Sequence, residues 1–196
     1  MPVPNAETDP IALYLRVVER ARSEGIDTTP AALATADRAG RPSVRVVLLR
    51  KVDERGFVFF TNYESRKARD LADNARAALC QHWPTLEEQV RVEGPVERVG
   101  AAESDEYFAG RPRDSQIGAW ASEQSRPLET RGVLEARIAE VEQRFSGTAV
   151  TRPPFWGGFR IVPDTIEFLY GRAGRLHERL LYTKTNGNWQ TGWLFP

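Results

Sequence analysis

The sequence predicts a mainly β protein with flanking helices, of the α+β class, built on an antiparallel barrel or sandwich. Short β-rich runs follow one another closely between residues 31 and 99. Turn signals such as DRAGRP and DERG separate these runs at hairpin distance. Further strands return after residue 156. Strands at this spacing, joined by tight turns, favour antiparallel over parallel pairing.

The elements are expected in the following order. Residues 9–25 should form an amphipathic helix, with Asp9 as N-cap and Gly25 as its stop. The strands that follow are AALATAD, PSVRVVLLRKV, GFVFFT, ARAALCQHW and EQVRVEGPVERV. Helices are expected after Ser65 and around residues 104–109. TRPPF then connects to the strands GGFRIV, TIEFLY, ERLLYTK and NWQTGWLF.

A longer helix is expected near residues 129–145, before these last strands. Its apolar side would consist of Val133, Leu134, Ile138, Val141 and Phe145.

Length and charge limit the class of protein. The 196 residues predict one domain, 1–196, with residues 1–8 as a flexible N-terminus. Lys and Arg total 27, as do Asp and Glu, so no overall field favours nucleic acid or an anionic membrane. Residues 1–10 have neither the basic n-region nor the apolar h-region of a signal peptide, and no 18 apolar residues run together, so neither secretion by that route nor a membrane span is expected. The single cysteine, Cys80, lies in an apolar run and predicts a small buried side chain in a reducing cytoplasm.

Two helical segments carry residues suited to anions. Ser65 as N-cap puts Arg66 and Lys67 in a first helical turn, where cations are unfavourable unless an anion binds there. The alternative is a pair of solvated side chains.

The second segment spaces Tyr107, Arg111 and Ser115 four residues apart, and Pro112 must start a new helix or bend the old one. A phenol, a guanidinium and a hydroxyl on one face suit a phosphate. Gln124 and Ser125 add neutral donors for a second ligand.

Two strand segments also contain cationic side chains in regular patterns. Strand alternation in GRLHERLLY would send Arg175, His177 and Arg179 to one face, over an anion or an electron-rich ring. An exposed cationic edge is the alternative. In VRVVLLRK, Arg45 and Arg50 flank a four-residue apolar run and should point to opposite faces. That pattern predicts a strand between the core and a second subunit, with ligand at the seam.

Several common sites have no signature here. His82 and His177 make no zinc-binding spacing with the distant cysteine, so no metal is expected. There is no GxGxxG after a strand, no Walker loop and no GxSxG.

The chain resembles the pyridoxine/pyridoxamine 5′-phosphate oxidases. The resemblance rests on RVVLLR, FFTNYESRKA, EEQVRVEG, YFAGRPRDSQIGAWASEQS, FWGGFR and RLHER, in this order, and extends from about Asp9 to Pro196. It implies an FMN-binding split β-barrel homodimer in the cytoplasm. The implied reaction oxidises pyridoxine or pyridoxamine 5′-phosphate to pyridoxal 5′-phosphate, with O2 reduced to H2O2.

The resemblance also implies roles for individual residues. The positions that would contact FMN are Arg45, Val46, Val47, Leu48, Leu49, Arg50, Phe60, Thr61, Arg66, Lys67, Gln89, Gln124, Ser125, Leu169 and Arg179. The positions that would hold the substrate phosphate are Arg50, Tyr107, Arg111 and Ser115. Arg175 and His177 would cover the pyridine ring and are the catalytic candidates.

Some positions depart from the family pattern. The family usually has lysine at Arg50, tyrosine at Phe60, Trp-Gln at Leu169 and Tyr170, and arginine at Trp193. These departures keep two alternatives open. One is a related flavin oxidase of the phenazine-pathway type, and the other is a protein that binds flavin or pyridoxal phosphate with little turnover.

Overall fold

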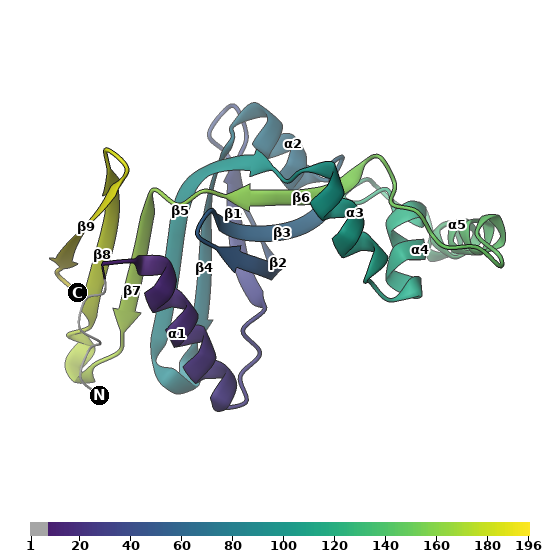
Figure 1. Cartoon of the computed structure of the whole chain (residues 1–196). Coiled ribbons are helices and arrows are strands. Elements are labelled where there is room, and N and C mark those ends of the chain that lie inside the picture. The colour runs from purple at the N-terminus through teal and green to yellow at the C-terminus, as the bar shows by residue number, and fades with distance from the viewer. Residues whose placement is uncertain (1–7) are drawn as a thin grey trace.

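The computed structural model describes residues 8–196 (Figure 1). The helices are α1 (Pro10–Ser23), α2 (Arg66–Asp73), α3 (Ala101–Ala109), α4 (Arg113–Ala121) and α5 (Arg131–Arg144), with short 3-10 turns η1 (Pro84–Leu86) and η2 (Ala173–Arg175). The strands are β1 (Pro30–Ala36), β2 (Pro42–Asp53), β3 (Gly56–Asn62), β4 (Arg76–Trp83), β5 (Glu88–Arg98), β6 (Trp156–Ile161), β7 (Thr165–Tyr170), β8 (Glu178–Thr185) and β9 (Asn188–Leu194).

The strands pair in the order β4-β1-β2-β3-β6-β5-β7-β8-β9, and every pairing is antiparallel. A further pairing of β4 with β5 closes the first six strands into a barrel. Strands β7, β8 and β9 extend the sheet on one side of this barrel, and helices α3, α4 and α5 project from the other side (Figure 1). The predicted α+β split barrel is therefore confirmed.

The barrel encloses the main apolar core. Phe57 and Phe59 of β3 and Leu79 of β4 are among its fully buried side chains. Helix α1 packs its apolar face on this core, and Asp9 caps it by accepting from the backbone N–H of Ile11 at 2.9 Å. The predicted first helix and its cap are confirmed. Truncating a buried Phe here would cost about 3–5 kcal/mol of stability.

A second apolar cluster lies outside the barrel, among α3, α4, α5 and β6. It contains Phe108, Ile117, Phe145, Val150 and Trp156. The apolar side predicted for residues 129–145 is only partly correct. Ile138 and Val141 pack on this cluster, but Val133 is 41% exposed and no residue of α5 itself is fully buried.

Most other expectations for the elements are confirmed to within a few residues. Helix α3 begins at Ala101, earlier than expected, and α4 is a separate helix that begins directly after Pro112. Cys80 is partly buried, and this burial raises the pKa of its thiol. No helix of residues 8–196 is long and apolar enough to cross a membrane. The expected flexible N-terminus falls almost wholly on residues 1–7, outside the described residues.

Candidate functional site

A cavity of about 650 Å³ lies between the barrel and helices α3 and α4. Strands β2 and β3 and the start of α2 form its barrel side. The lining residues are Val46, Val47, Leu48, Arg50, Phe60, Thr61, Asn62, Lys67, Tyr107, Arg111, Pro112, Ser115, Gly118, Ala119, Ser122, Gln124 and Trp156. Its volume is in the range that cofactors and small ligands occupy.

The helical wall carries the predicted phosphate residues. Tyr107 lies near the end of α3, Arg111 in the connection, and Ser115 in the first turn of α4. Pro112 occupies the N-cap position of α4, because a proline cannot continue α3. All three predicted residues line the cavity, so the structure brings them together as expected.

Three aromatic rings form a stack beside these residues. Phe60 lies parallel to Tyr107, with 4.0 Å between ring centroids, and to Trp156, at 5.6 Å. Gly158 of β6 makes room for this stack, because a Cβ there would lie 2.9 Å from the Phe60 ring. Sequence reasoning assigned no role to Trp156, although it lies within the FWGGFR segment.

Arg111 is held over this aromatic surface. Its guanidinium carbon lies 4.6 Å from the centroid of the Trp156 ring, a cation–π contact. Its Nη1 atom is buried and has no hydrogen-bond partner. Burial lowers the pKa of Arg111, Tyr107 raises it, and the charge of Arg50 lowers it. Arg111 lines the cavity and keeps one buried guanidinium nitrogen without a partner, which indicates a site for an anion.

A second group of cations gathers at the start of α2. Ser65 occupies the predicted N-cap position, although its side chain makes no capping bond. Lys67 is buried and lines the cavity, whereas Arg66 is exposed and lies outside the lining. Burial and the nearby charge of Arg45 lower the pKa of Lys67 to about 8.

Arg45 lies on the core side of β2, away from the cavity lining. Its guanidinium donates to the carbonyl of Leu33 at 3.1 Å and to Thr35 Oγ1 at 2.8 Å, and it lies 3.7 Å from Asp70. Burial lowers the pKa of Arg45, while the charge of Asp70 raises it and that of Arg66 lowers it. Asp70 of α2 is thus the ion-pair partner of Arg45.

Polar side chains connect this group to the loop after α4. Lys67 Nζ donates to Thr61 Oγ1 at 3.1 Å, and Thr61 Oγ1 donates to Gln124 Oε1 at 3.1 Å. Asn62 Nδ2 donates to the carbonyl of Ser122 at 3.4 Å. Ser125 is exposed at a φ of 71° and is not among the lining residues, so the structure separates it from its neighbour Gln124.

Strand β2 behaves as its sequence predicts. Val44 is 69% exposed and Val46 is 67% exposed, whereas Val47 and Leu49 are buried against the core. Arg50 lines the cavity and Arg45 faces the core, so the two arginines point to opposite faces. Leu49 belongs to the core and not to the cavity lining.

The remaining predicted FMN contacts form a separate row across β5, β7 and β8. Gln89 pairs with Leu169, and Leu169 pairs with Arg179. Glu167 accepts from Arg179 at 2.8 Å, and this bond raises the pKa of Arg179. Strands β7 and β8 lie on the opposite side of the barrel from α3 and α4 (Figure 1). The row therefore does not line the cavity of its own chain.

The prediction that strand alternation aligns Arg175 and His177 with Arg179 is wrong. Arg175 lies in the turn η2 at a φ of 60°, after Gly174 at a φ of 68°, and β8 begins only at Glu178. Arg175 is exposed in this turn. His177 Nδ1 accepts from the backbone N–H of Arg172 at 3.2 Å. In a neutral ring held this way, the hydrogen lies on Nε2, which can then donate but not accept.

The positions at which this chain departs from the family pattern lie in different parts of the structure. Phe60 belongs to the cavity wall, and Leu169 to the row on β7. Tyr170 is buried in the main core, with a hydroxyl that has no partner. Trp193 is 60% exposed on β9.

Two family models match the chain. Residues 19–145 match the pyridoxamine 5′-phosphate oxidase model, and residues 156–196 match the pyridoxine 5′-phosphate oxidase C-terminal dimerisation region. The second match covers β6 to β9, so the expected homodimer is confirmed.

Two similar proteins are both named pyridoxine/pyridoxamine 5′-phosphate oxidase. A pyridoxine/pyridoxamine 5′-phosphate oxidase of Anaeromyxobacter dehalogenans is 56% identical over 198 residues, with all of both chains covered. One of Myxococcus xanthus is 54% identical and covers 96% of this chain and 92% of its own.

Solved structures agree with this fold. PhzG from Burkholderia lata, solved in complex with tetrahydrophenazine-1-carboxylic acid, has a TM-score of 0.94 at 32% identity and covers 100% of this chain and 98% of its own. A pyridoxamine 5′-phosphate oxidase-related, FMN binding protein from Nostoc punctiforme has a TM-score of 0.77 at 18% identity, covers 97% of this chain and all of its own, and supports the fold alone. The chain therefore belongs to the pyridoxine/pyridoxamine 5′-phosphate oxidase family and is an FMN-dependent oxidase.

Proposed function

We propose that the protein oxidises pyridoxine 5′-phosphate or pyridoxamine 5′-phosphate to pyridoxal 5′-phosphate. In the first reaction one O2 becomes one H2O2. In the second, water is also consumed and ammonia is released. The observation that carries this proposal is that Arg111, which lines the cavity with Tyr107 and Ser115, has a buried Nη1 atom without a partner. A phosphate ester supplies the acceptor oxygens that these donors lack.

The residues at the start of α2 fit the phosphate of FMN. Arg66 and Lys67 lie in the first turn of this helix, and Arg45 lies close enough for its charge to lower the pKa of Lys67. We assign Arg66 and Lys67 to this phosphate, with Arg45 behind them. The cavity-lining residues Val46, Val47, Leu48, Arg50, Phe60, Thr61 and Gln124 would contact the remainder of the cofactor. When bound, FMN supplies the two-electron acceptor of the reaction.

We propose that the row on β5, β7 and β8 completes the cavity of the second subunit. Gln89, Leu169 and Arg179 would contact the cofactor there, and Arg175 and His177 would lie over the substrate. Within one chain, the residues that the family places at a single site lie on opposite sides of the barrel (Figure 1). In a dimer, each subunit would supply one of these two sets to the same cavity. This arrangement requires a dimer for activity.

His177 would orient the substrate as a hydrogen-bond donor. Its Nδ1 atom already accepts from the Arg172 backbone, so the neutral ring offers Nε2–H to a ligand. We therefore assign the proton released by the substrate to solvent or to the substrate itself, and not to His177.

Lys67 makes cofactor binding depend on pH. Its protonated form attracts the phosphate, and its pKa of about 8 means that the free protein loses this charge as pH rises from about 7 to about 9. The dissociation constant for FMN should then rise, by up to about tenfold per pH unit above the pKa. Fluorescence titration of FMN at several pH values measures this. In Lys67→Gln, FMN binding should be weaker and its pH dependence flat; the same slope in both proteins would contradict the assignment.

The exposed face of β2 should lie in the dimer interface. Val44 is 69% exposed but does not line the cavity. A Val44→Glu change would bury a charge there and should raise the dimer dissociation constant by ~10-fold or more. Sedimentation velocity over a dilution series measures this, with Val133→Glu on α5 as the control. Equal dimerisation of both variants would place the interface elsewhere.

A second candidate function is oxidation of a phenazine precursor. The 0.94 TM-score to PhzG, solved with a tetrahydrophenazine carboxylic acid, favours it, while the relatives above 50% identity favour the phosphorylated vitamers. Purified FMN-loaded protein should be assayed for oxygen uptake and peroxide with each substrate. We expect turnover with the vitamers alone. Turnover with only the phenazine precursor would support the second function, and turnover with neither would indicate a binding protein.

A further inference from the structure

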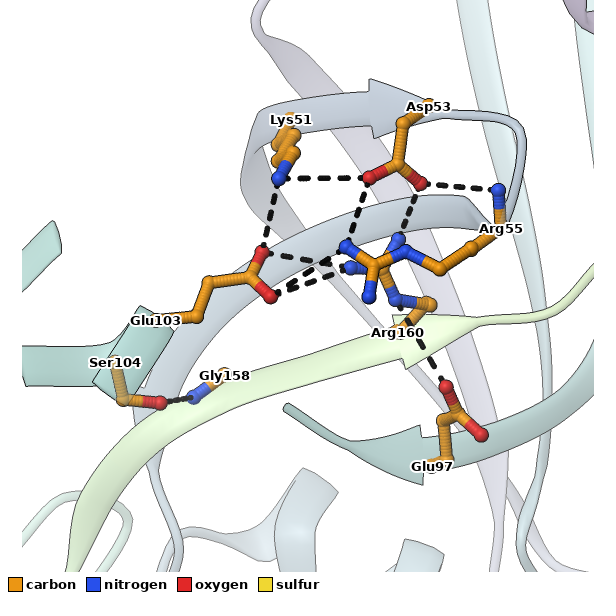
Figure 2. Close-up of polar contacts among 8 residues, drawn as sticks. All are labelled: Lys51, Asp53, Arg55, Glu97, Glu103, Ser104, Gly158 and Arg160. Carbon is orange, nitrogen blue, oxygen red and sulfur yellow. Dashed lines mark hydrogen bonds and ion pairs between the residues drawn. The ribbon is translucent and has the colours of Figure 1, made fainter. Parts of the chain in front are cut away.

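An ion network with a buried arginine joins α3 to strands β2, β5 and β6 (Figure 2). At its centre is Arg160 of β6, which is 2% exposed although it carries a full charge. Its guanidinium donates to Asp53 Oδ1 at 2.5 Å and to Glu103 Oε1 at 3.4 Å, and lies 3.9 Å from Glu97. A buried arginine with three carboxylates around it is fully paired, and removal of one partner leaves charge uncompensated.

Two further cations complete the network. Lys51 lies 3.5 Å from both Asp53 and Glu103, and Arg55 lies 3.1 Å from Asp53 and 3.7 Å from Glu103. Burial alone would raise the pKa of Asp53, but hydrogen bonds from Arg55 and the charge of Arg160 lower it below its ordinary value. Three cations thus face three carboxylates, and Glu103 is the member of this network that lies on α3 (Figure 2).

The network lies beside two of the residues assigned to the substrate phosphate, Tyr107 on α3 and Arg50 on β2. Glu103 lies one helical turn before Tyr107 on α3, so the two side chains share a face of the helix. Lys51 directly follows Arg50 at an irregularity in the β2–β3 register. A smaller cavity of about 400 Å³ lies between them, lined by Arg50, Lys51, Glu103 and Tyr107 among others. The position of Tyr107 relative to Arg50 therefore depends on how Glu103 is held.

We propose that Glu103 is a positioning residue for substrate phosphate. Through its ion pairs with Lys51 and Arg160 it fixes the rotation of α3 on the barrel, and thereby the placement of Tyr107 against Phe60 and Arg50. This inference rests on the proposed function, because it takes Tyr107, Arg111 and Arg50 as the phosphate grip.

Other contacts hold α3 in place, so the role of Glu103 can be tested without unfolding this helix. Ser104 Oγ accepts from the backbone N–H of Gly158 at 3.3 Å, and Phe108 is buried in the second apolar cluster. These contacts would keep α3 docked when the Glu103 charge is removed. The expected defect is a displaced phosphate grip, not an unfolded helix.

Glu103→Gln tests the proposal, because it removes the charge and keeps the size of the side chain. Glu106→Gln is the matched control: it makes the same change on the same helix and beside the same smaller cavity, but is not part of the network. Both variants should be prepared as the FMN-loaded dimer. Flavin content, KM and kcat for pyridoxine 5′-phosphate, and the calorimetric affinity for inorganic phosphate should be measured for each.

We expect Glu103→Gln to raise KM about fivefold to tenfold and to weaken phosphate binding by a similar factor, with kcat and flavin content within about twofold of the parent. Glu106→Gln should change neither constant by more than about twofold. Equal behaviour of the two variants would overturn the proposal, as would a loss of kcat or flavin in Glu103→Gln without a change in phosphate affinity.

If the parent protein does not oxidise the vitamer, the proposed function fails. The role of Glu103 is then decided by inorganic phosphate alone: weaker binding in Glu103→Gln than in Glu106→Gln supports it, and equal binding overturns it.

Discussion

Arg111→Met is expected to lower kcat/KM for pyridoxine 5′-phosphate by ~10²-fold, with little change in flavin content. Charge-assisted hydrogen bonds contribute about 1.5–3 kcal/mol each, and the Nη1 atom of Arg111 is buried without a protein partner. Methionine keeps most of the apolar contact with Trp156, so the wall of the cavity should persist. Steady-state oxidation at saturating oxygen, with flavin absorbance per subunit, measures both quantities.

Arg144→Met is the control for this change. Arg144 also lies over an indole, 4.4 Å from the Trp120 ring centroid, but on α5 and outside the cavity lining. It should retain catalytic efficiency. A comparable loss in both variants would mean that cation–π packing, and not anion binding, explains the position of Arg111.

Arg175→Leu should lower catalytic efficiency by ~10²-fold or more, about 2.7 kcal/mol of transition-state stabilisation, because a misplaced substrate reacts slowly. Flavin content should change little, since Arg179 and not Arg175 is assigned to FMN. The left-handed backbone at Arg175 supports a functional role, because a non-glycine residue adopts φ near 60° at some cost in energy.

Arg131→Leu serves as the control, because its side chain is 90% exposed on α5. Unchanged turnover in Arg175→Leu, with intact flavin, would show that the turn before β8 does not cover the substrate. That result would favour oxidation of a phenazine-type substrate.

Sequence patterns were sufficient where a single element determines the geometry. The four-residue spacing of Tyr107, Arg111 and Ser115 predicted one wall of the cavity, and all three residues line it, although Arg111 lies in the connection between α3 and α4. The odd spacing of Arg45 and Arg50 in β2 predicted their opposite directions, and the alternation of buried and exposed residues along the strand agrees with it.

Patterns failed where the geometry depends on turns or on distant segments. Gly174 and Arg175 both adopt positive φ, and this turn delays β8 until Glu178, so strand alternation could not apply before it. The stack of Phe60, Tyr107 and Trp156 joins residues far apart in the chain, and no local periodicity reports such contacts. The row formed by Gln89, Leu169 and Arg179 required the strand register.

Anaerobic mixing of the FMN-loaded dimer with pyridoxine 5′-phosphate tests whether the protein oxidises the vitamer. We expect the flavin absorbance near its visible maximum to be lost and one pyridoxal 5′-phosphate to form per flavin, and we expect admission of oxygen to restore the absorbance with formation of peroxide. Flavin that stays oxidised in the presence of saturating pyridoxine 5′-phosphate and pyridoxamine 5′-phosphate would contradict this expectation.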